Sequence, residues 1–284
     1  PSIDEQRAIA AVLGVLDDKI EQNRRTSRTL EALALATFKA WFVDFEPVKA
    51  KMSGQMSFPG LPPAAFAALP TRFVDSPLGQ VPEGWQVRSV AALCHVIDCL
   101  HTKKPEQNGE GGGLLLQLNN IRDDGLLDLS DQYLISQSDY ARWSAKFETR
   151  EGDCVITNVG RVGAVAQIPS GVAAALGRNM TGIRHRPEFP YPAFLIQAFL
   201  SSAMREEITR NTDTGTILNA LNVKNIGKLR LVVPDPALLT ATESLLRPIR
   251  ALMEHGLTEA SDLATLRDYL LPRLLSGRVR VRPA

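Results

Sequence analysis

The sequence lacks the marks of membrane proteins, of disulfide-bonded secreted proteins and of strongly charged proteins. No apolar run reaches the length that crosses a bilayer and no secretory signal is present, so the pattern predicts a soluble chain. Three cysteines among 284 residues are an odd and sparse set, which is typical of a reducing cytoplasm. The formal net charge is +1, so any contact with nucleic acid must depend on local patches and not on the charge of the whole chain.

Motifs of the common enzyme classes are absent as well. The sequence has no nucleophile elbow, no zinc-protease helix and no kinase motif set. Gly160 and Gly163 lack both the dinucleotide fingerprint and a P-loop lysine, so we interpret them as hairpin glycines. Residues of the metal-ligand type gather only at Cys94, His95, Cys99 and His101. These four lie in one short stretch and not in two spaced pairs, which predicts no metal site.

The sequence is rich in helical periodicity at its start. Between residues 3 and 45, apolar and small side chains recur in alternating steps of four and three. The positions are Ile9, Leu13, Leu16, Ile20, Asn23, Ser27, Leu30, Ala34, Thr37 and Trp41. A repeat of about 3.5 residues is typical of a coiled-coil seam, and the helix would be on the order of 60 Å long. The seam is too narrow to form a core alone, so it requires a partner helix.

The same apolar phase returns at the end of the chain, from Pro234 onward. Sliding the first segment along the chain until Leu30 falls on Leu263 places apolar residues on apolar residues along its length. This match predicts that the two ends form partner helices. The alternative is that any two amphipathic helices align in this way. Pro248 interrupts the second pattern, which predicts a shorter or bent second helix.

Changes of composition divide the chain into four predicted segments. Residues 1–47 form a helical region, 48–80 a linker rich in Pro, Ala, Gly and Ser, 81–233 a globular domain, and 234–284 a second helical region. Within the globular domain, short β-rich runs alternate with turns, and residues 191–209 have helical spacing. The predicted fold class is α+β (α/β): one globular domain flanked by two long helices that pair as an antiparallel coiled coil.

Polar loops with hydrogen-bond donors punctuate the globular domain. They lie at residues 101–104, 119–122, 157–161, 178–181 and 214–219. Their Arg, Lys, Asn and Thr side chains are those that bond phosphates and base edges in DNA complexes. Because loops are polar in any case, ordinary solvated loops are the alternative interpretation.

Several motifs together resemble the DNA sequence-specificity subunits of type I restriction-modification systems. The segments that carry the resemblance are IDEQRAIAAVLGVLDDKIEQNRR with LEALALATFKAWFVDFEPV, VPEGWQV, EGDCVITNVGRVGAVAQIP, LGRNMTGIRH, YPAFLIQAFLSSAMREEI, TGTILNALNVKNIGKLRLVVPDP and LRDYLLPRLLSGRV. They look like the family's helical spacer, the start of a target-recognition domain, that domain's recurrent strands and loops, and the closing helical region. Their order and spacing, over almost the whole chain, make the resemblance specific.

The resemblance implies a non-catalytic, cytoplasmic subunit that binds double-stranded DNA and holds no cofactor itself. Family members have two target-recognition domains, each reading half of a split site, and two long helices that set the spacing. Methyltransferase subunits, which supply the S-adenosylmethionine site, dock on those helices, and the restriction subunit joins through the complex.

This chain departs from the family pattern because it has one recognition domain and both helical regions. It therefore resembles either a half-size subunit or the C-terminal half of a full subunit. Its first residue, Pro1, is expected to arise by processing, trimming or cutting. Two copies are expected to pair head to tail as a homodimer and to read a symmetric split site.

On this hypothesis the DNA-binding residues belong to the polar loops. They are Lys103, Lys104, Asn119, Asn120, Arg122, Asn158, Arg161, Arg178, Asn179, Thr216 and Asn219. The cations are expected at phosphates or guanine edges, and the asparagines at bases. Trp41, Phe42 and Phe45 form a predicted partner-docking patch, with the alternative that the chain's own linker covers them. Two other hypotheses are a structural coiled-coil adaptor whose globular domain binds protein, and an enzyme that uses Cys94 or Cys154.

Overall fold

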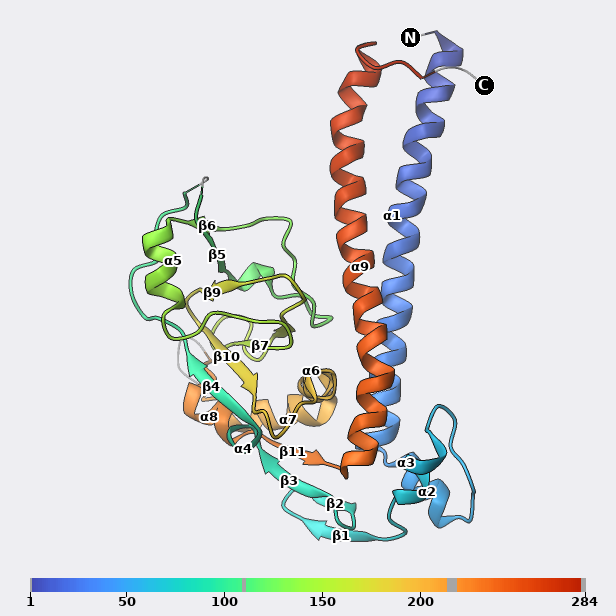
Figure 1. Cartoon of the computed structure of the whole chain (residues 1–284), viewed down its shortest axis with the longest axis vertical. Coiled ribbons are helices and arrows are strands. Elements are labelled where there is room, and N and C mark those ends of the chain that lie inside the picture. The colour runs from blue at the N-terminus through green and yellow to red at the C-terminus, as the bar shows by residue number, and fades with distance from the viewer. Residues whose placement is uncertain (1, 109–110, 214–218, 282–284) are drawn as a thin grey trace. The chain divides into compact units, whose positions relative to one another are not determined.

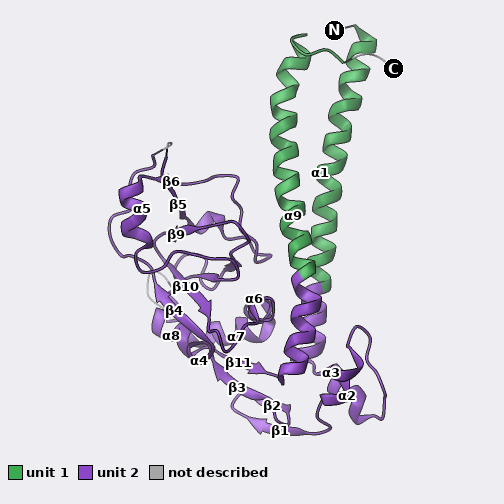
Figure 2. Cartoon of the chain, viewed as in Figure 1, with its two compact units in different colours: residues 1–33, 248–284 green, residues 34–247 purple. Residues whose placement is uncertain are grey.

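The chain divides into two compact units, which are coloured separately in Figure 2. The computed structural model describes residues 2–108, 111–213 and 219–281. Unit 1 comprises residues 1–33 and 248–284, and unit 2 comprises residues 34–247. Unit 1 is helical, whereas the strands of the described residues lie in unit 2.

Two long helices supply unit 1, namely α1 (Ile3–Phe38) and α9 (Pro236–Leu275). α9 has 40 residues against 36 for α1 and contains Pro248 in its interior. Of the prediction of a shorter or bent second helix, the shorter length is therefore wrong. A proline removes one backbone hydrogen bond from a helix. Leu246 and Ile249, on either side of the proline, are buried, and such burial outweighs local helix propensity.

Within unit 1 the two helices lie side by side and run antiparallel (Figure 1). Arg267 Nη1 lies 2.8 Å from Asp17 Oδ1, and Asn23 Nδ2 donates to Glu259 Oε2 at 2.7 Å. The predicted seam positions are buried or half-buried, and Ile20 is only 3% exposed. The antiparallel helical pair that the periodicity predicts is therefore confirmed. No helix in the described part of the chain is long and apolar enough to cross a membrane.

Unit 2 carries the shorter helices and the strands (Figure 1). Its α-helices are α2 (Glu46–Met52), α3 (Pro63–Ala68), α4 (Val90–Leu93), α5 (Gln137–Ser144), α6 (Pro192–Leu200), α7 (Ser202–Asn211) and α8 (Val223–Lys228). A π-helix at Lys39–Val43 follows α1, and a 3₁₀-helix lies at Leu118–Asn120. The strands are β1 (Phe73–Ser76), β2 (Gly79–Pro82), β3 (Gln86–Ser89), β4 (Cys94–Asp98), β5 (Gly113–Leu116), β6 (Leu134–Ile135), β7 (Cys154–Thr157), β8 (Val165–Gln167), β9 (Ala174–Leu176), β10 (Met180–His185) and β11 (Arg230–Val233).

The largest sheet of unit 2 is antiparallel and has the strand order β4-β10-β7-β8. The hairpin β7–β8 contains Gly160 and Gly163, whose φ angles of 84° and 79° fit glycine and strain other residues. A second sheet has the order β6-β5-β9, in which β5 and β9 are parallel. Leu116, Val155 and Leu176 belong to one buried core cluster, which draws on strands of both sheets. The predicted mixed helix-and-sheet fold is confirmed.

Residues 48–80, which the sequence predicts to be a linker, contain ordered structure. They include α3, most of α2 and the β1–β2 hairpin. Phe66 and Leu69 are buried at 4% and 2% exposure, and Lys51 Nζ donates to the carbonyl of Ala67 at 2.6 Å. Phe66 and Leu69 therefore anchor this Pro- and Ala-rich segment through their burial.

Candidate nucleic-acid interface

The polar loops predicted from the sequence leave their strands at one end of unit 2. The register of the large sheet pairs Asp98, at the end of β4, with Thr181, and pairs Thr157, at the end of β7, with Met180. Both loops that follow β4 and β7 therefore begin beside the start of β10. The parallel strands β5 and β9 end together at the pair Leu116 and Leu176.

Backbone hydrogen bonds join the loops to one another. Asn158 N donates to Asn179 O at 2.8 Å, and Gly177 N donates to Leu116 O at 2.9 Å. Leu221 N donates to Asn158 O at 2.9 Å. We call the resulting surface the polar edge, and it consists of residues 101–104, 117–123, 158–161, 177–179 and 219–222. Segments that are far apart in the sequence thus meet in one place.

Two predicted base-reading residues, Asn120 and Asn158, are committed to the fold. The Asn120 amide donates to two backbone carbonyls at 2.8 and 3.1 Å and accepts from Gln117 N at 2.8 Å. The Asn158 amide donates to Leu221 O at 2.9 Å and accepts from the Thr181 hydroxyl at 3.0 Å. They are 2% and 9% exposed. We correct the prediction for both, because amides buried and bonded in this way join loops and do not face a ligand.

Three predicted cations are held at the polar edge by partners within the chain. Lys104 Nζ bonds Gln117 Oε1 at 3.0 Å and lies 3.7 Å from the centre of the Tyr133 ring. Arg122 forms a bidentate pair with Asp124, with its shortest bond at 2.7 Å. The Arg161 guanidinium donates to a backbone carbonyl and pairs with an exposed aspartate. The charges of Arg122 and Arg161 are therefore partly neutralised before any ligand arrives, whereas the uncharged partners of Lys104 hold it in place and leave its charge intact.

Other predicted residues present exposed side chains at the same edge. Lys103, Asn119, Arg178 and Asn219 are exposed, and within the described residues no hydrogen bond or ion pair engages their side-chain polar groups. Asn179 is half-buried. Thr216 lies outside the described residues. Free donors that protrude from a fixed backbone are what a ligand-reading surface requires.

The turn that carries Arg178 is closely constrained. A Cβ on the preceding Gly177 would lie 2.1 Å from the carbonyl oxygen of Leu116, so only glycine fits there. Asn179 has a left-handed φ of 63°, which asparagine tolerates better than most residues. Arg178 thus extends as a long cation from a backbone whose neighbours are both fixed.

Only part of the cysteine and histidine cluster seen in the sequence comes together in the structure. Among the described residues, Asp98 joins Cys99 and His101, with donor atoms within 4.8 Å of one another. His101 Nε2 and Asp98 Oδ2 are 2.8 Å apart. Burial raises the pKa of Cys94 to about 12. That thiol stays protonated near neutral pH, which argues against Cys94 as a nucleophile.

The predicted docking patch at Trp41, Phe42 and Phe45 is wrong. Trp41 and Phe42 lie in the π-helix and are 2% and 5% exposed. The Phe42 ring centre lies 6.0 Å from that of Trp85 and 5.2 Å from that of Phe194. Phe45 is half-buried, with its ring centre 5.6 Å from Trp85. Phe42 therefore packs against the globular domain, whereas Phe45 also meets Phe73 of the predicted linker, with ring centres 5.7 Å apart. The alternative, in which the linker covers these residues, holds only in part.

Gln117, Asp123 and Asp124 organise the polar edge, although none of them is among the residues predicted to bind DNA. Gln117 holds Lys104 and also donates through Nε2 to the carbonyl of Leu116 at 3.0 Å. Asp123 and Asp124 neutralise the two arginines nearest the 3₁₀-helix. The signal in the sequence is that Asp123 and Asp124 directly follow Arg122, and it does not say which acid pairs with which arginine.

Two features define the class of protein. The two ends of the chain form an antiparallel pair of long helices, and the residues between them form one mixed domain with a polar edge. The crystal structure of the S subunit of a type I restriction-modification system from M. genitalium has a TM-score of 0.62 to this chain at 15% identity. The likeness covers 96% of this chain and 61% of that one, and it shows a shared fold.

No family model matches the sequence, but sequence comparison finds similar proteins of one kind. The chain is 24% identical to the specificity subunit of the type I restriction enzyme HindI from Haemophilus influenzae, over 98% of this chain and 68% of that protein. It is also 24% identical to the MjaIX specificity subunit from Methanocaldococcus jannaschii, over 99% of this chain and 60% of that protein. The chain is similar to type I specificity subunits, and this similarity confirms the resemblance of its motifs. It spans about two thirds of the length of these relatives.

Proposed function

We propose that this chain is a DNA-binding specificity subunit and that its polar edge reads one half of a split site. The observation that carries the proposal is the convergence of exposed donors, above all Lys103, Asn119 and Arg178, on loops that are joined by backbone hydrogen bonds and, for the loop of Lys103, by the bond from Lys104 to Gln117. Proteins read bases with such donors while cations bind the phosphates. The names of the two curated relatives support the same function.

The residues of the polar edge divide into readers and supports. Arg178 is the candidate for bidentate contact with a guanine, because it is exposed and unpaired among the described residues. Lys103 is assigned to a phosphate, and Asn119 and Asn219 to base edges. Arg122 and Arg161 keep exposed nitrogen atoms beside their carboxylate partners and serve as weaker phosphate contacts.

The proposed subunit is not itself an enzyme and holds no cofactor. Methyl transfer belongs to a methyltransferase partner, which binds S-adenosylmethionine, and a restriction subunit joins the same cytoplasmic complex. The raised pKa of Cys94 and the complete burial of Cys154 fit this assignment, because a nucleophile must be ionised and accessible.

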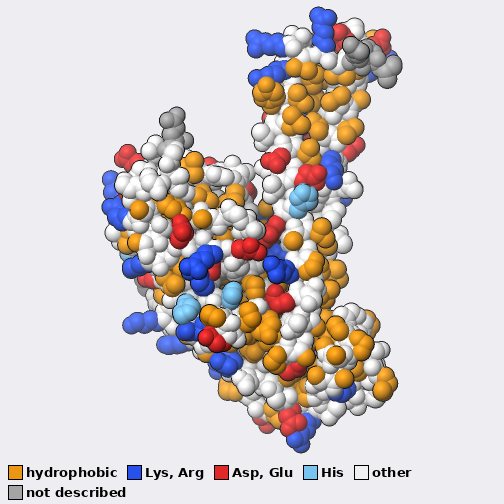
Figure 3. Space-filling view, viewed as in Figure 1, with side chains coloured by type: hydrophobic (Ala, Val, Ile, Leu, Met, Phe, Trp, Pro, Cys, Tyr) orange, Lys and Arg blue, Asp and Glu red, His pale blue; other side chains and the backbone are white. Residues whose placement is uncertain are grey.

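Partner subunits are assigned to the exposed apolar side chains of unit 1, since the aromatic patch of unit 2 is buried. Figure 3 shows apolar side chains gathered over α1 and α9 toward the two ends of the chain. The exposed large apolar residues of unit 1 as a whole are Ile3, Val12, Val15, Leu33, Leu252, Leu266, Tyr269, Leu271, Leu275 and Val279. Exposed apolar patches of this kind mark protein interaction sites. A methyltransferase subunit and a second copy of this chain are the proposed occupants.

DNA binding by the chain in complex with its methyltransferase tests the proposal. Arg178→Ala should lose about 1–3 kcal/mol of discrimination at one base pair. Lys103→Ala should weaken binding to all sequences alike and reduce the salt dependence by about one phosphate contact. Lys49→Ala, on exposed α2, is the control and should change neither property.

A combined variant decides between DNA reading and a purely structural role. Replacing Lys103, Asn119, Arg178 and Asn219 by alanine should abolish sequence preference while the complex still assembles. Unchanged affinity and preference in this variant would overturn the proposal and favour the protein-binding adaptor.

A further inference from the structure

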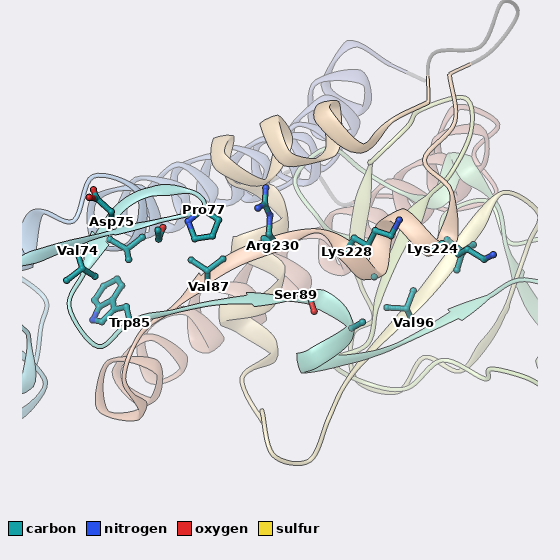
Figure 4. Close-up of a pocket in the computed structure, with 15 residues that line it drawn as sticks. Val74, Asp75, Pro77, Trp85, Val87, Ser89, Val96, Lys224, Lys228 and Arg230 are labelled. Carbon is teal, nitrogen blue, oxygen red and sulfur yellow. The ribbon is translucent and has the colours of Figure 1, made fainter.

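A groove of about 1120 Å³ lies in unit 2, and no residue of the polar edge lines it. It is lined by residues of the β1–β2 hairpin, β3, α4, β4, α8 and β11, as Figure 4 shows. No residue predicted to bind DNA lines it. The volume exceeds the roughly 300–1,000 Å³ of typical small-molecule pockets. The groove therefore suits a larger occupant with several side chains.

One side of the groove is apolar. Val74, Val87 and Val96 come from three different strands and line the groove, with Val74 and Val87 near Trp85 and Val96 near Lys224 in Figure 4. Val74 is 39% exposed and Val87 and Val96 are half-buried, so their methyl groups face solvent in the isolated chain. Contact with apolar side chains would remove this surface from water at a gain of about 25 cal/mol per Å².

The other side of the groove is positively charged. Lys224 and Lys228 are exposed and lie four residues apart on α8, on one face of the helix. Within the described residues, neither forms an ion pair with a carboxylate. Arg230 continues the row in Figure 4, but its guanidinium is neutralised by the buried Glu207, with Nε and Oε1 2.8 Å apart. Asp75 is the single acid among the residues that line the groove.

This combination of surfaces indicates what the groove binds. We propose that it receives an acidic amphipathic segment of a partner polypeptide, with apolar side chains against the three valines and carboxylates against Lys224 and Lys228. Amphipathic segments bind in the grooves of other proteins by burying their apolar face and pairing their charged side chains at the rim. A DNA duplex would use the two lysines but gain nothing from the valines, because DNA interfaces are polar. The proposal does not depend on which surface reads DNA.

Fluorescence anisotropy with a labelled synthetic peptide tests the proposal on the full chain. The probe is a short amphipathic peptide of Glu and Leu with one Phe, and its counterpart carries Lys at every Glu. We expect the acidic peptide to bind roughly tenfold or more tightly than the basic one. The double variant Lys224→Glu/Lys228→Glu should lose this preference. Arg205→Glu, an exposed cation on α7 outside the groove, should change the affinity less than about twofold.

A second measurement locates the peptide and guards against misfolded variants. A photo-crosslinking amino acid in place of the exposed Val74 should crosslink to the acidic peptide, and the same amino acid at the exposed Met56, which lines neither the groove nor the apolar surface of unit 1, should not. Equal binding of both peptides, or no effect of the double charge reversal, would overturn the proposal. Complete displacement of the peptide by a DNA duplex, together with loss of duplex affinity in the double reversal, would instead assign the groove to nucleic acid.

Discussion

The helical pair of unit 1 and the polar edge of unit 2 both bury asparagines, but these asparagines have different structural roles. In unit 1, Asn23 lies in the seam and bonds Glu259 on the opposite helix. This bond, with help from Lys19, lowers the pKa of the Glu259 carboxyl. In the polar edge, Asn120 and Asn158 bond carbonyls of neighbouring loops. One asparagine fixes the register of two helices, whereas the other two build a surface on which different residues are displayed.

This difference shows where a local sequence pattern is enough to predict the direction of a side chain. The seam follows from a repeat within one helix, so each of its positions has a known direction before folding. The polar edge is assembled from five loops, and the direction of each side chain depends on contacts with the other four. Predictions for unit 1 are therefore tested by stability, and predictions for the polar edge by separating stability from binding.

The largest effect is expected at the aromatic residue that the sequence assigned to docking. Phe42→Ala should lower the free energy of unfolding by about 3–5 kcal/mol, because the ring is buried against Trp85 and Phe194. Leu33→Ala removes a side chain that is 50% exposed and should cost less than about 0.5 kcal/mol. Urea denaturation followed by circular dichroism measures both. Equal small losses would return Phe42 to the docking surface.

The seam should respond according to helical phase. Ile20→Ala, at 3% exposure, should cost about 2–5 kcal/mol. Val15→Ala is made on the same helix at 67% exposure and should be nearly neutral. The two variants can be compared in one series of thermal melts. If Val15→Ala is the more damaging of the pair, the assignment of the buried face is wrong.

The polar edge should separate stability from recognition. Asn158→Ala leaves the Leu221 carbonyl and the Thr181 hydroxyl without their partner and should cost about 1–3 kcal/mol of stability. Asn219→Ala, at an exposed position of the same edge, should leave stability unchanged and reduce DNA affinity. Parallel unfolding and binding curves measure the two effects. A stable Asn158→Ala protein with altered base preference would restore Asn158 as a reader.

The smallest effect concerns pH. Burial raises the pKa of Glu243, whose Oε1 accepts the backbone N–H of Phe194 at 2.8 Å, with Arg247 and His185 nearby. A carboxyl whose pKa is raised on folding stabilises the protein fully below its ordinary pKa of 4.5. That contribution is lost as pH rises through the folded-state pKa.

A matched pair of variants isolates this group. Glu243→Gln keeps an acceptor for the Phe194 N–H but cannot ionise, so its stability should fall less than wild type between acid and neutral pH. Glu188→Gln, at an exposed position, should follow wild type. Unfolding free energies at several pH values above 4.5 measure the difference. Parallel curves for wild type and Glu243→Gln would contradict the assignment.

Much of the fold could be predicted from the sequence, because its signals are local. The period of Ile9, Leu13 and Ile20 predicted a helix and its buried face, and Gly160 with Gly163 predicted a hairpin. The length of α9 could not be predicted from Pro248, since tertiary burial decides whether a proline ends a helix.

The candidate site could be predicted only as a set of loops. Residue type identified Arg178 and Asn158 equally well as polar loop residues, yet one is exposed and the other is bonded on both sides of its amide. That difference is created by strand register and by partners distant in the sequence, such as Leu221. Likewise, Trp41 and Phe42 have the composition of a docking patch, and only packing shows that they belong to a core.

The most direct test is to sequence methylated bases in cells that carry this chain with its methyltransferase subunit. Wild type should produce a modified motif of two short blocks separated by a fixed gap, and Arg178→Gln should change the base preference at one position in a block while the gap stays the same. An identical motif in wild type and in the variant lacking Lys103, Asn119, Arg178 and Asn219 would contradict the role of the polar edge.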